Sequence, residues 1–400
     1  MFFKKLSALV LVIFVASFFS TSVGFAAAKQ PFYYAGWLPF WKKQSGAIDI
    51  SDNLYDFHEL SPFSYKVLSD GTIVDDLKLK EGFWPAWLSA VKDAGVKNIP
   101  TIAWFDGPAI HKLLTNKKKR IAHEDAITKL VKDMKFDGID IDYEAKLADT
   151  KPYFSTFIYG LAIRLHPLGK KLTCTVEART PLTSLLSVIT NGMPEDTRTA
   201  NDYAVLNKYC DEVRIMAYDQ GLVDGKLDMT KGNGTIYAPI ADPEWAEKTV
   251  REALKYISPK KIMLGIPTYG YEYEVGWYNG QLIYKRLRSH TFFQAIERAA
   301  RVGAIPMRNS AGELSFAYAT STSIDSYGGA SPNLTWKVTS TIPEFVASTS
   351  AQGLFTRFVS FSDSKSAADK IALAKKLGIR GVVFFKFDGE QDPLLWNEMK

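Results

Sequence analysis

Short apolar segments rich in β-branched and aromatic residues alternate along the chain with segments whose apolar residues recur at helical spacing. The first pattern predicts strands and the second predicts amphipathic helices. We predict strands at residues 32–38, 59–65, 98–104, 136–144, 171–177, 212–218, 261–269 and 381–387. Helices are predicted between them, at residues 85–94, 123–134, 155–165, 200–209, 243–256 and 367–377. Eight strands alternating with helices favour a closed parallel sheet, so the predicted fold class is α/β, a (β/α)8 TIM barrel.

Two of the helices carry clear end signals. Asp242 followed by Pro243 is typical of an N-cap and a first helical residue. Ser364 is the predicted cap of the last helix, and Gly378 is its predicted end. These signals fix where the last two helices of the barrel begin.

A long segment separates predicted strand seven from the last helix. It spans about 90 residues, which is too long for an ordinary loop. A helix-like stretch at 292–302 and a strand-like stretch at 313–318 fall inside it, and Trp336 and residues 355–360 add further apolar material. We therefore predict a small α+β insertion after strand seven, at about residues 271–360, that walls one side of the cleft. Its many aromatic and β-branched residues argue against disorder.

The fourth predicted strand carries an acidic stripe. Side chains along a strand alternate between its two faces, so Asp140, Asp142 and Glu144 share one face while Ile139, Ile141 and Tyr143 share the other. Same-face neighbours lie about 6–7 Å apart, so these carboxylates raise one another's pKa. A carboxyl that keeps its proton near neutral pH can act as a general acid. The alternative is a solvated acidic strand, against which the apolar Ile-Ile-Tyr face argues.

The same stretch resembles the signature of glycoside hydrolase family 18, the chitinase-like family, written Asp-x-x-Asp-x-Asp-x-Glu. Here the signature is complete, with Asp137, Asp140, Asp142 and Glu144. The resemblance implies catalysis assisted by the N-acetyl group of the substrate, with retention. Glu144 would protonate the leaving oxygen, Asp142 would orient the acetamide, and Asp140 would share a proton with Asp142. Asp137 is out of phase with the other three, so we expect a structural role at the strand entrance.

Two further segments resemble family motifs. Met216 to Asp219 matches the strand-six motif Met-x-Tyr-Asp, which implies that Tyr218 contacts the acetamide and Asp219 contacts sugar hydroxyls. Gly265 to Gly270 is similar to the family's strand seven. Residues 61–65 and 358–363 resemble the bacterial spore-cortex and cell-wall branch of N-acetylglucosaminidases more than other chitinases.

Active sites of such barrels lie at the C-terminal ends of the strands. Aromatic and acidic residues end the predicted strands, which suits a saccharide cleft, although single aromatic residues there can also be core. The candidate substrate-binding residues are Trp37, Trp104, Met216, Asp219, Tyr269 and Phe385. Phe385 stands where the family commonly has a Trp under the central sugar, and Trp104-Phe105 stands where a Gly-Gly pair is common.

The N-terminus predicts export. Lys4 and Lys5 precede an apolar run and then Ala26-Ala27-Ala28, so residues 1–28 are a predicted signal peptide and residues 29–400 the catalytic barrel. An uncleaved membrane anchor is the alternative, but the run is short for a span. The net charge of +6 is mild, which gives no reason to expect nucleic acid. Cys174 and Cys210 could be a disulfide or two buried thiols.

The leading hypothesis is an exported retaining hydrolase of β-1,4-linked N-acetylglucosamine polymers, either chitin or peptidoglycan. No cofactor is implied, the scattered histidines imply no metal, no stable membrane insertion is expected after signal cleavage, and a monomer is the default state. One alternative is a chitinase-like lectin that binds without cleaving. Another is a glycosidase with two enzymic carboxylates, using an acid on strand four and a nucleophile among Glu177, Glu272 and Glu274.

Overall fold

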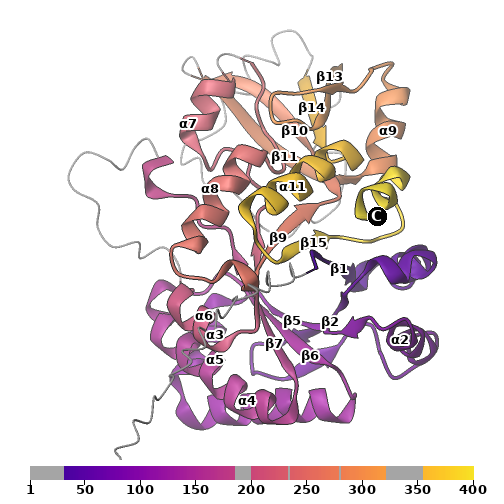
Figure 1. Ribbon diagram of the computed structural model, residues 1–400. Coiled ribbons are helices and arrows are strands. Elements are labelled where there is room, and N and C mark those ends of the chain that lie inside the picture. The colour runs from indigo at the N-terminus through magenta and orange to yellow at the C-terminus, as the bar shows by residue number, and fades with distance from the viewer. Residues whose placement is uncertain (1–30, 185–199, 233–234, 279–280, 321–354) are drawn as a thin grey trace, which may run out of the picture. The chain divides into compact units, whose positions relative to one another are not determined.

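The computed structural model describes residues 31–184, 200–232, 235–278, 281–320 and 355–400. The predicted signal peptide, residues 1–28, lies outside the described residues. Eight parallel strands form the barrel shown in Figure 1. They are β1 (Tyr33–Pro39), β2 (Glu59–Val67), β5 (Thr101–Trp104), β6 (Gly138–Tyr143), β7 (Lys171–Glu177), β8 (Glu212–Met216), β9 (Ile262–Pro267) and β15 (Gly381–Phe385).

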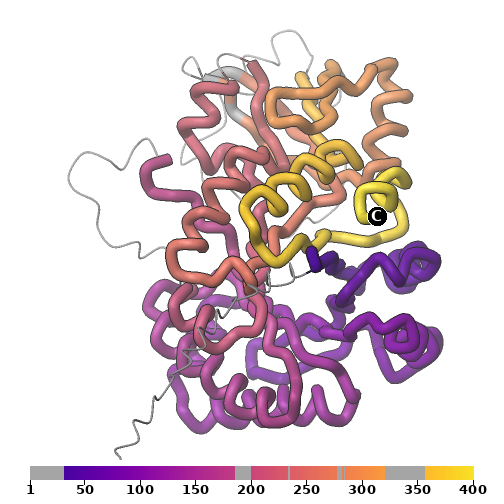
Figure 2. The backbone as a smooth tube through the Cα atoms, viewed as in Figure 1, coloured from indigo at the N-terminus to yellow at the C-terminus, as the bar shows by residue number. Residues whose placement is uncertain are grey.

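The barrel closes because its first strand pairs with its second and its last. Tyr33 to Gly36 of β1 align in parallel with Gly381 to Phe384 of β15, while Ala35 to Pro39 align with the start of β2. In Figure 2 the indigo strand β1 lies beside the yellow strand β15 at this junction. Two short strands extend the sheet, namely β3 (Ile73–Asp75), antiparallel to β2, and β4 (Lys97–Asn98). The predicted TIM barrel is confirmed.

Helices cover the barrel, and most of them begin or end at a residue that is suited to capping a helix. Asp242 accepts a hydrogen bond from the Glu244 backbone N–H (2.9 Å), as its predicted cap role requires. Asp363, and not Ser364, caps the last helix, where it forms a capping box with Ser366. The helices are α1 (Ser45–Ile50), α2 (Trp84–Asp93), α3 (Gly107–Thr115), α4 (Lys117–Asp133), α5 (Lys151–Leu165), α6 (Tyr203–Tyr209), α7 (Gly225–Leu227), α8 (Pro243–Leu254), α9 (Phe292–Arg301) and α11 (Ser364–Leu377).

The apolar core lies mainly between strands and helices. Ile139 and Ile141 of β6 pack there against Val131 of α4 and Phe157 of α5, and these two helices lie side by side outside the barrel in Figure 1. None of the helices in the described part of the chain is both long enough and apolar enough to cross a bilayer.

The predicted insertion is a separate antiparallel sheet in the order β11-β10-β14-β13-β12. Its strands are β10 (Tyr269–Tyr278), β11 (Gln281–Thr291), β12 (Met307–Arg308), β13 (Leu314–Thr320) and β14 (Phe355–Phe361). Tyr269, which the sequence pattern assigns to the end of strand seven, instead begins β10, because the barrel strand β9 ends at Pro267. The packing of α9 on this sheet buries Ala295 and Ala299.

The two cysteines form a disulfide. Cys174 of β7 and Cys210, just before β8, are bonded with their Cα atoms 6.2 Å apart, which resolves the alternatives left open by the sequence. The bond links two neighbouring strands on the side of the sheet that faces the helices, since both cysteines belong to the outer core.

Replacing both cysteines with Ala is expected to lower the free energy of unfolding by about 2–4 kcal/mol, because the crosslink restricts the unfolded chain. Thermal unfolding followed by circular dichroism, with and without reductant, measures the loss. The wild type should lose stability in reductant and the double variant should not respond. Equal midpoints for both proteins in both buffers would contradict the prediction.

Candidate active site

The acidic face of β6 points into the barrel, as the alternation predicts. Asp140 accepts four hydrogen bonds, from Trp37 Nε1 (3.1 Å), Thr101 Oγ1 (2.8 Å), Thr175 Oγ1 (2.7 Å) and Arg214 Nη1 (3.4 Å). The donors come from β1, β5, β7 and β8. Asp140 therefore connects its own strand to four others across the barrel interior.

Arg214 is the buried cation beneath this carboxylate. Its guanidinium also donates to Glu212 Oε1 (2.9 Å) and Ser61 Oγ (2.7 Å), and lies 3.6 Å from Glu59. Burial alone would lower the pKa of Arg214. The charges of Asp140, Glu212 and Glu59 outweigh this effect and raise the pKa above its usual value, so the side chain stays charged. Sequence reasoning missed Arg214, because an isolated Arg in an apolar strand gives no sign of its partners.

Asp142 and Glu144 follow Asp140 toward the mouth of the barrel. Asp142 is buried, and its Oδ1 atom has no hydrogen-bond partner among the residues that the structure describes. Burial raises the pKa of Asp142 well above its usual range, and Glu144 and Asp140 raise it further. Burial also raises the pKa of Glu144 to about 8, with Glu177 and Asp219 adding to the shift and Lys146 opposing it. Glu144 is therefore poised to hold a proton near neutral pH.

Asp137 stands apart from these three, at the strand entrance. Its carboxylate accepts a hydrogen bond from the Asn98 backbone N–H (2.9 Å), and its own N–H donates to the Asn98 carbonyl (3.0 Å). It therefore ties the start of β6 to β4, which is the structural role that its phase predicts.

Tyr218 and Asp219 lie just after β8, which is separated from β6 by β7 alone. Tyr218 is buried, and after burial the Asp142 charge is the largest contribution that raises its pKa. Asp219 accepts hydrogen bonds from Tyr269 Oη (2.5 Å) and Tyr271 Oη (2.9 Å). Both tyrosines belong to β10, so this strand of the insertion holds Asp219 at the edge of the site. The predicted site residue Tyr269 therefore contacts the site through its hydrogen bond to Asp219.

Phe385 forms the centre of an aromatic floor. Its ring stacks on Tyr218, with centroids 5.2 Å apart and planes 12° apart, and meets the rings of Trp37 and Tyr269 edge-on at 5.9 Å. Met216 packs against the same interior cluster. These candidate residues are thus brought together with the acidic face of β6.

Trp104 does not join them. It is only 2% exposed and packs on the outer side of the barrel against Tyr143 (5.5 Å between centroids) and His123. Thr101 points inward to Asp140, so alternation along β5 sends Trp104 outward. The prediction that Trp104 binds substrate is therefore not supported by its position.

Three aromatic residues that sequence reasoning did not select line the mouth of the barrel instead. Trp41 is 46% exposed and contacts Phe385 (6.4 Å) and Phe63 (6.1 Å), while Phe63 stacks on Phe105 (6.5 Å), which is 55% exposed. Counting alternate positions from Thr101 would have selected Phe105 in place of Trp104.

The acids Glu272 and Glu274 are engaged inside the insertion sheet. Glu272 accepts hydrogen bonds from Tyr318 (2.6 Å) and pairs with His290 (2.8 Å), and Glu274 pairs with Arg357. In the described part of the chain, neither carboxylate is hydrogen-bonded to the acidic residues of β6. Of the three acids considered for a second enzymic carboxylate, Glu177 remains.

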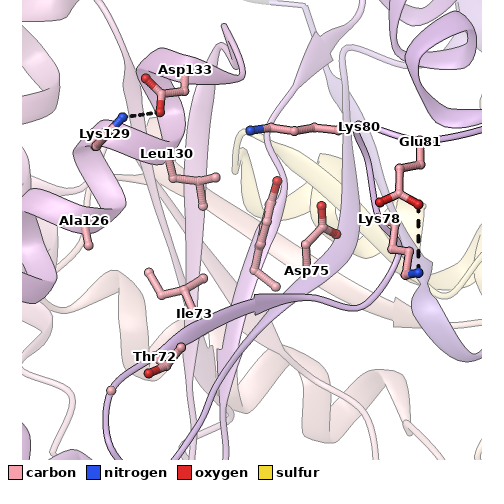
Figure 3. A pocket seen from close by; sticks show the side chains of 12 residues that line it. Thr72, Ile73, Asp75, Lys78, Lys80, Glu81, Ala126, Lys129, Leu130 and Asp133 are labelled. Carbon is pink, nitrogen blue, oxygen red and sulfur yellow. Dashed lines mark hydrogen bonds and ion pairs between the residues drawn. The ribbon is translucent and has the colours of Figure 1, made fainter.

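A cavity of about 710 Å³ lies away from this chemistry, on the outer flank of the barrel (Figure 3). It is bounded by the β3 hairpin and by α4, and Figure 3 shows Lys129 and Asp133 paired at its edge. None of the acidic residues of β6 lines it. The interior face of β6 is therefore the better candidate site, on the chemistry of its residues.

Comparison with protein families matches residues 84–390 to the family described as "Glycosyl hydrolases family 18". The chain belongs to this family. The match covers β6 with its four-acid signature, Met216 to Asp219, and all five strands of the insertion. The family match and the acidic face of β6 therefore concern the same segment of the chain.

Curated proteins that are similar to the chain include glycosylases of Bacillus subtilis (strain 168). The putative sporulation-specific glycosylase YdhD of Bacillus subtilis (strain 168) is 25% identical over 282 residues, or 70% of this chain and 61% of YdhD. The chain covers less than two thirds of the length of the curated relatives that it matches.

Solved structures with low identity share the fold. The spore cortex-lytic enzyme SleL of Bacillus megaterium QM B1551 has a TM-score of 0.65 and 19% identity, with 94% of this chain and 74% of that chain covered. A chitinase from Chromobacterium violaceum ATCC 12472 has a TM-score of 0.66 and 18% identity, with 92% and 98% covered.

Replacing Arg214 with Met is expected to lower the free energy of unfolding by about 3–5 kcal/mol, because the buried carboxylate of Asp140 loses the cation that pairs with it. Urea unfolding measures the change. The control is Lys129→Met, which breaks an exposed pair with Asp133 (side chains 75% and 48% exposed) and should change stability by less than about 1 kcal/mol. Equal losses in the two variants would contradict the prediction.

Proposed function

We propose that this chain is an exported, retaining glycoside hydrolase that cleaves β-1,4-linked N-acetylglucosamine polymers with assistance from the substrate's own acetamide. The observation that carries the proposal is the contrast between two neighbouring carboxyls inside the barrel. Asp140 is saturated by four donors, while Asp142 has a buried oxygen with no partner in the described part of the chain. A bound acetamide N–H would supply the hydrogen bond that Asp142 lacks.

In the first step Glu144 donates its proton to the glycosidic oxygen. The carbonyl oxygen of the acetamide attacks the anomeric carbon of its own sugar, and the bond to the leaving sugar breaks. Asp142 holds the acetamide N–H and stabilises the positive oxazolinium ion that forms. Tyr218 is the hydroxyl donor near the acetamide. Phe385 and Trp37 form the floor beneath the sugar ring.

In the second step Glu144, now a carboxylate, removes a proton from water. The water oxygen attacks the anomeric carbon, the bond to the acetamide oxygen breaks, and the configuration is retained. One residue serves as acid and then as base because both steps occur on the same face of the sugar. Asp219 is positioned by two tyrosines to accept hydrogen bonds from sugar hydroxyls.

Two lines support export. The N-terminal sequence has the pattern of a signal peptide. The Cys174–Cys210 disulfide is typical of proteins that fold in an oxidising compartment. The names of similar proteins include both cortex-lytic enzymes and chitinases, so peptidoglycan and chitin are both offered in the test below.

Glu144→Gln is expected to lower hydrolysis by at least about 100-fold, because an amide cannot donate the proton that the leaving oxygen needs. The assay measures products from N-acetylglucosamine oligomers and from purified peptidoglycan, side by side, with protein starting at Lys29. Cleavage of one substrate that the variant abolishes would also identify the polymer.

The same assay tests the lectin alternative, which the smaller ring of Phe385 motivates. Binding of oligomers by the wild type, measured by calorimetry, without products after long incubation would contradict the hydrolase and support the lectin. Full activity in Glu144→Gln would contradict the assigned acid.

The wild-type pH profile provides a separate prediction. The acid must be protonated to act, so kcat/KM should fall as pH rises through the pKa of Glu144, which lies at about 8. Activity should therefore persist at pH 7 and decline above about pH 8. A profile that already falls between pH 4 and pH 5 would mean that Glu144 has an ordinary carboxyl pKa and would contradict the assignment.

A further inference from the structure

The chain turns sharply directly after Glu144. β6 ends at Tyr143, the Glu144 N–H donates to the Trp104 carbonyl (2.8 Å), and Ala145 has a positive φ of 53°. A residue other than glycine rarely adopts this conformation unless its surroundings hold it there. The catalytic side chain therefore sits on a peptide whose position depends on contacts from outside β6.

Lys146 supplies the first of these contacts. Its side chain is only 1% exposed. Its ammonium donates a hydrogen bond to the Tyr143 carbonyl, lies 3.4 Å from Glu177 Oε2, and lies 4.8 Å from the centre of the Phe154 ring. A buried ammonium held on three sides has little freedom, so it fixes the carbonyl on the N-terminal side of Glu144.

Glu177, the last residue of β7, supplies the second contact. Its Oε1 atom accepts a hydrogen bond from the Ala145 N–H (3.1 Å), and its Oε2 atom accepts one from Asn201 Nδ2 (2.7 Å). Glu177 thus fixes the N–H on the C-terminal side of Glu144. Lys146 and Glu177 are paired with each other, so the two peptide groups flanking the proton donor are held by one ion pair.

The charged and titratable groups around Glu144 come from β6, from the turn that follows it, from the end of β7 and from the segment after β8. Asp140 and Asp142 precede it on β6, Glu177 ends β7, Lys146 follows in the turn, and Tyr218 and Asp219 follow β8. Glu177 and Asp219 favour the protonated form of Glu144, whereas Lys146 favours the ionised form. The two members of the pair therefore act on Glu144 in opposite directions.

We propose that Lys146 and Glu177 are a pair of positioning residues that hold Glu144 in its catalytic place and, through their opposite charges, set the pH range over which it donates a proton. The inference rests on the proposed role of Glu144 as acid. It extends that role to two residues outside the acidic signature, which are not members of the Asp-x-x-Asp-x-Asp-x-Glu pattern.

The test is a pair of single substitutions with opposite expected effects. Lys146→Met removes a positive charge near Glu144, so the alkaline limb of the kcat/KM profile should move to higher pH. Glu177→Gln removes a negative charge, so the limb should move to lower pH. Each shift should be roughly one pH unit, the lower end of the effect that a nearby charge has on the pKa of a carboxyl. Lys146→Arg keeps the charge and should return the limb toward its wild-type position.

A second readout does not depend on turnover. The ¹³C side-chain resonance of Glu144, identified by its loss in Glu144→Gln, should titrate with the same opposite shifts in the two variants. If the wild type cleaved neither polymer, the proposed function would fail while this titration still tested the pair. Circular dichroism checks that each variant is folded, and Lys129→Met is the control that should shift neither readout.

A purely structural pair would give a different result. Folded variants whose limbs and resonances stay at the wild-type pH would overturn the proposal, and so would shifts in the same direction. If Lys146→Met does not fold, Glu177→Gln and Lys146→Arg still decide, because the first must lower the midpoint and the second must keep it near the wild-type value.

Discussion

The buried pairing of Arg214 with Asp140 is the interaction on which the site depends. A carboxylate enclosed in a barrel is strongly destabilised unless a cation and hydrogen-bond donors surround it. Arg214 supplies the cation, and Trp37, Thr101 and Thr175 complete the set of donors to Asp140. These donors come from four strands. The contacts that satisfy Asp140 therefore also hold β6 in place relative to those four strands of the barrel.

The saturation of one carboxyl gives its neighbours their chemistry. Asp140 uses its oxygens on the protein, whereas Asp142, one step nearer the mouth, has a buried oxygen that finds no donor among the residues described by the structure. Burial and the nearby charges then raise the pKa of Asp142 and of Glu144. Three acids on one face of one strand thus have different surroundings, and in glycosidases generally it is the environment that assigns roles to paired carboxyls. The insertion adds to this arrangement from above, since Tyr271 of β10 helps to hold Asp219.

Much of this could be predicted from the sequence, because strand alternation is a local property. The inward face of Asp140 and Asp142, the entrance role of Asp137 and the insertion after strand seven all follow from spacing and segment length. What could not be predicted depends on contacts between distant segments. Trp104 faces outward because the register of β5 is set by Thr101 bonding to Asp140. Arg214 and Lys146 show their importance only once other strands bring Glu59, Asp140 and Glu177 beside them.

The central claim is that the substrate's own acetamide is the nucleophile. The most direct measurement compares cleavage of two matched oligomers, one N-acetylated and one with a free amine on the sugar next to the scissile bond. The account predicts product from the acetylated oligomer alone, because Asp142 and Tyr218 then have an acetamide to orient. Comparable cleavage of both oligomers would contradict it, since a protein carboxylate such as Glu177 would then have to act as the nucleophile.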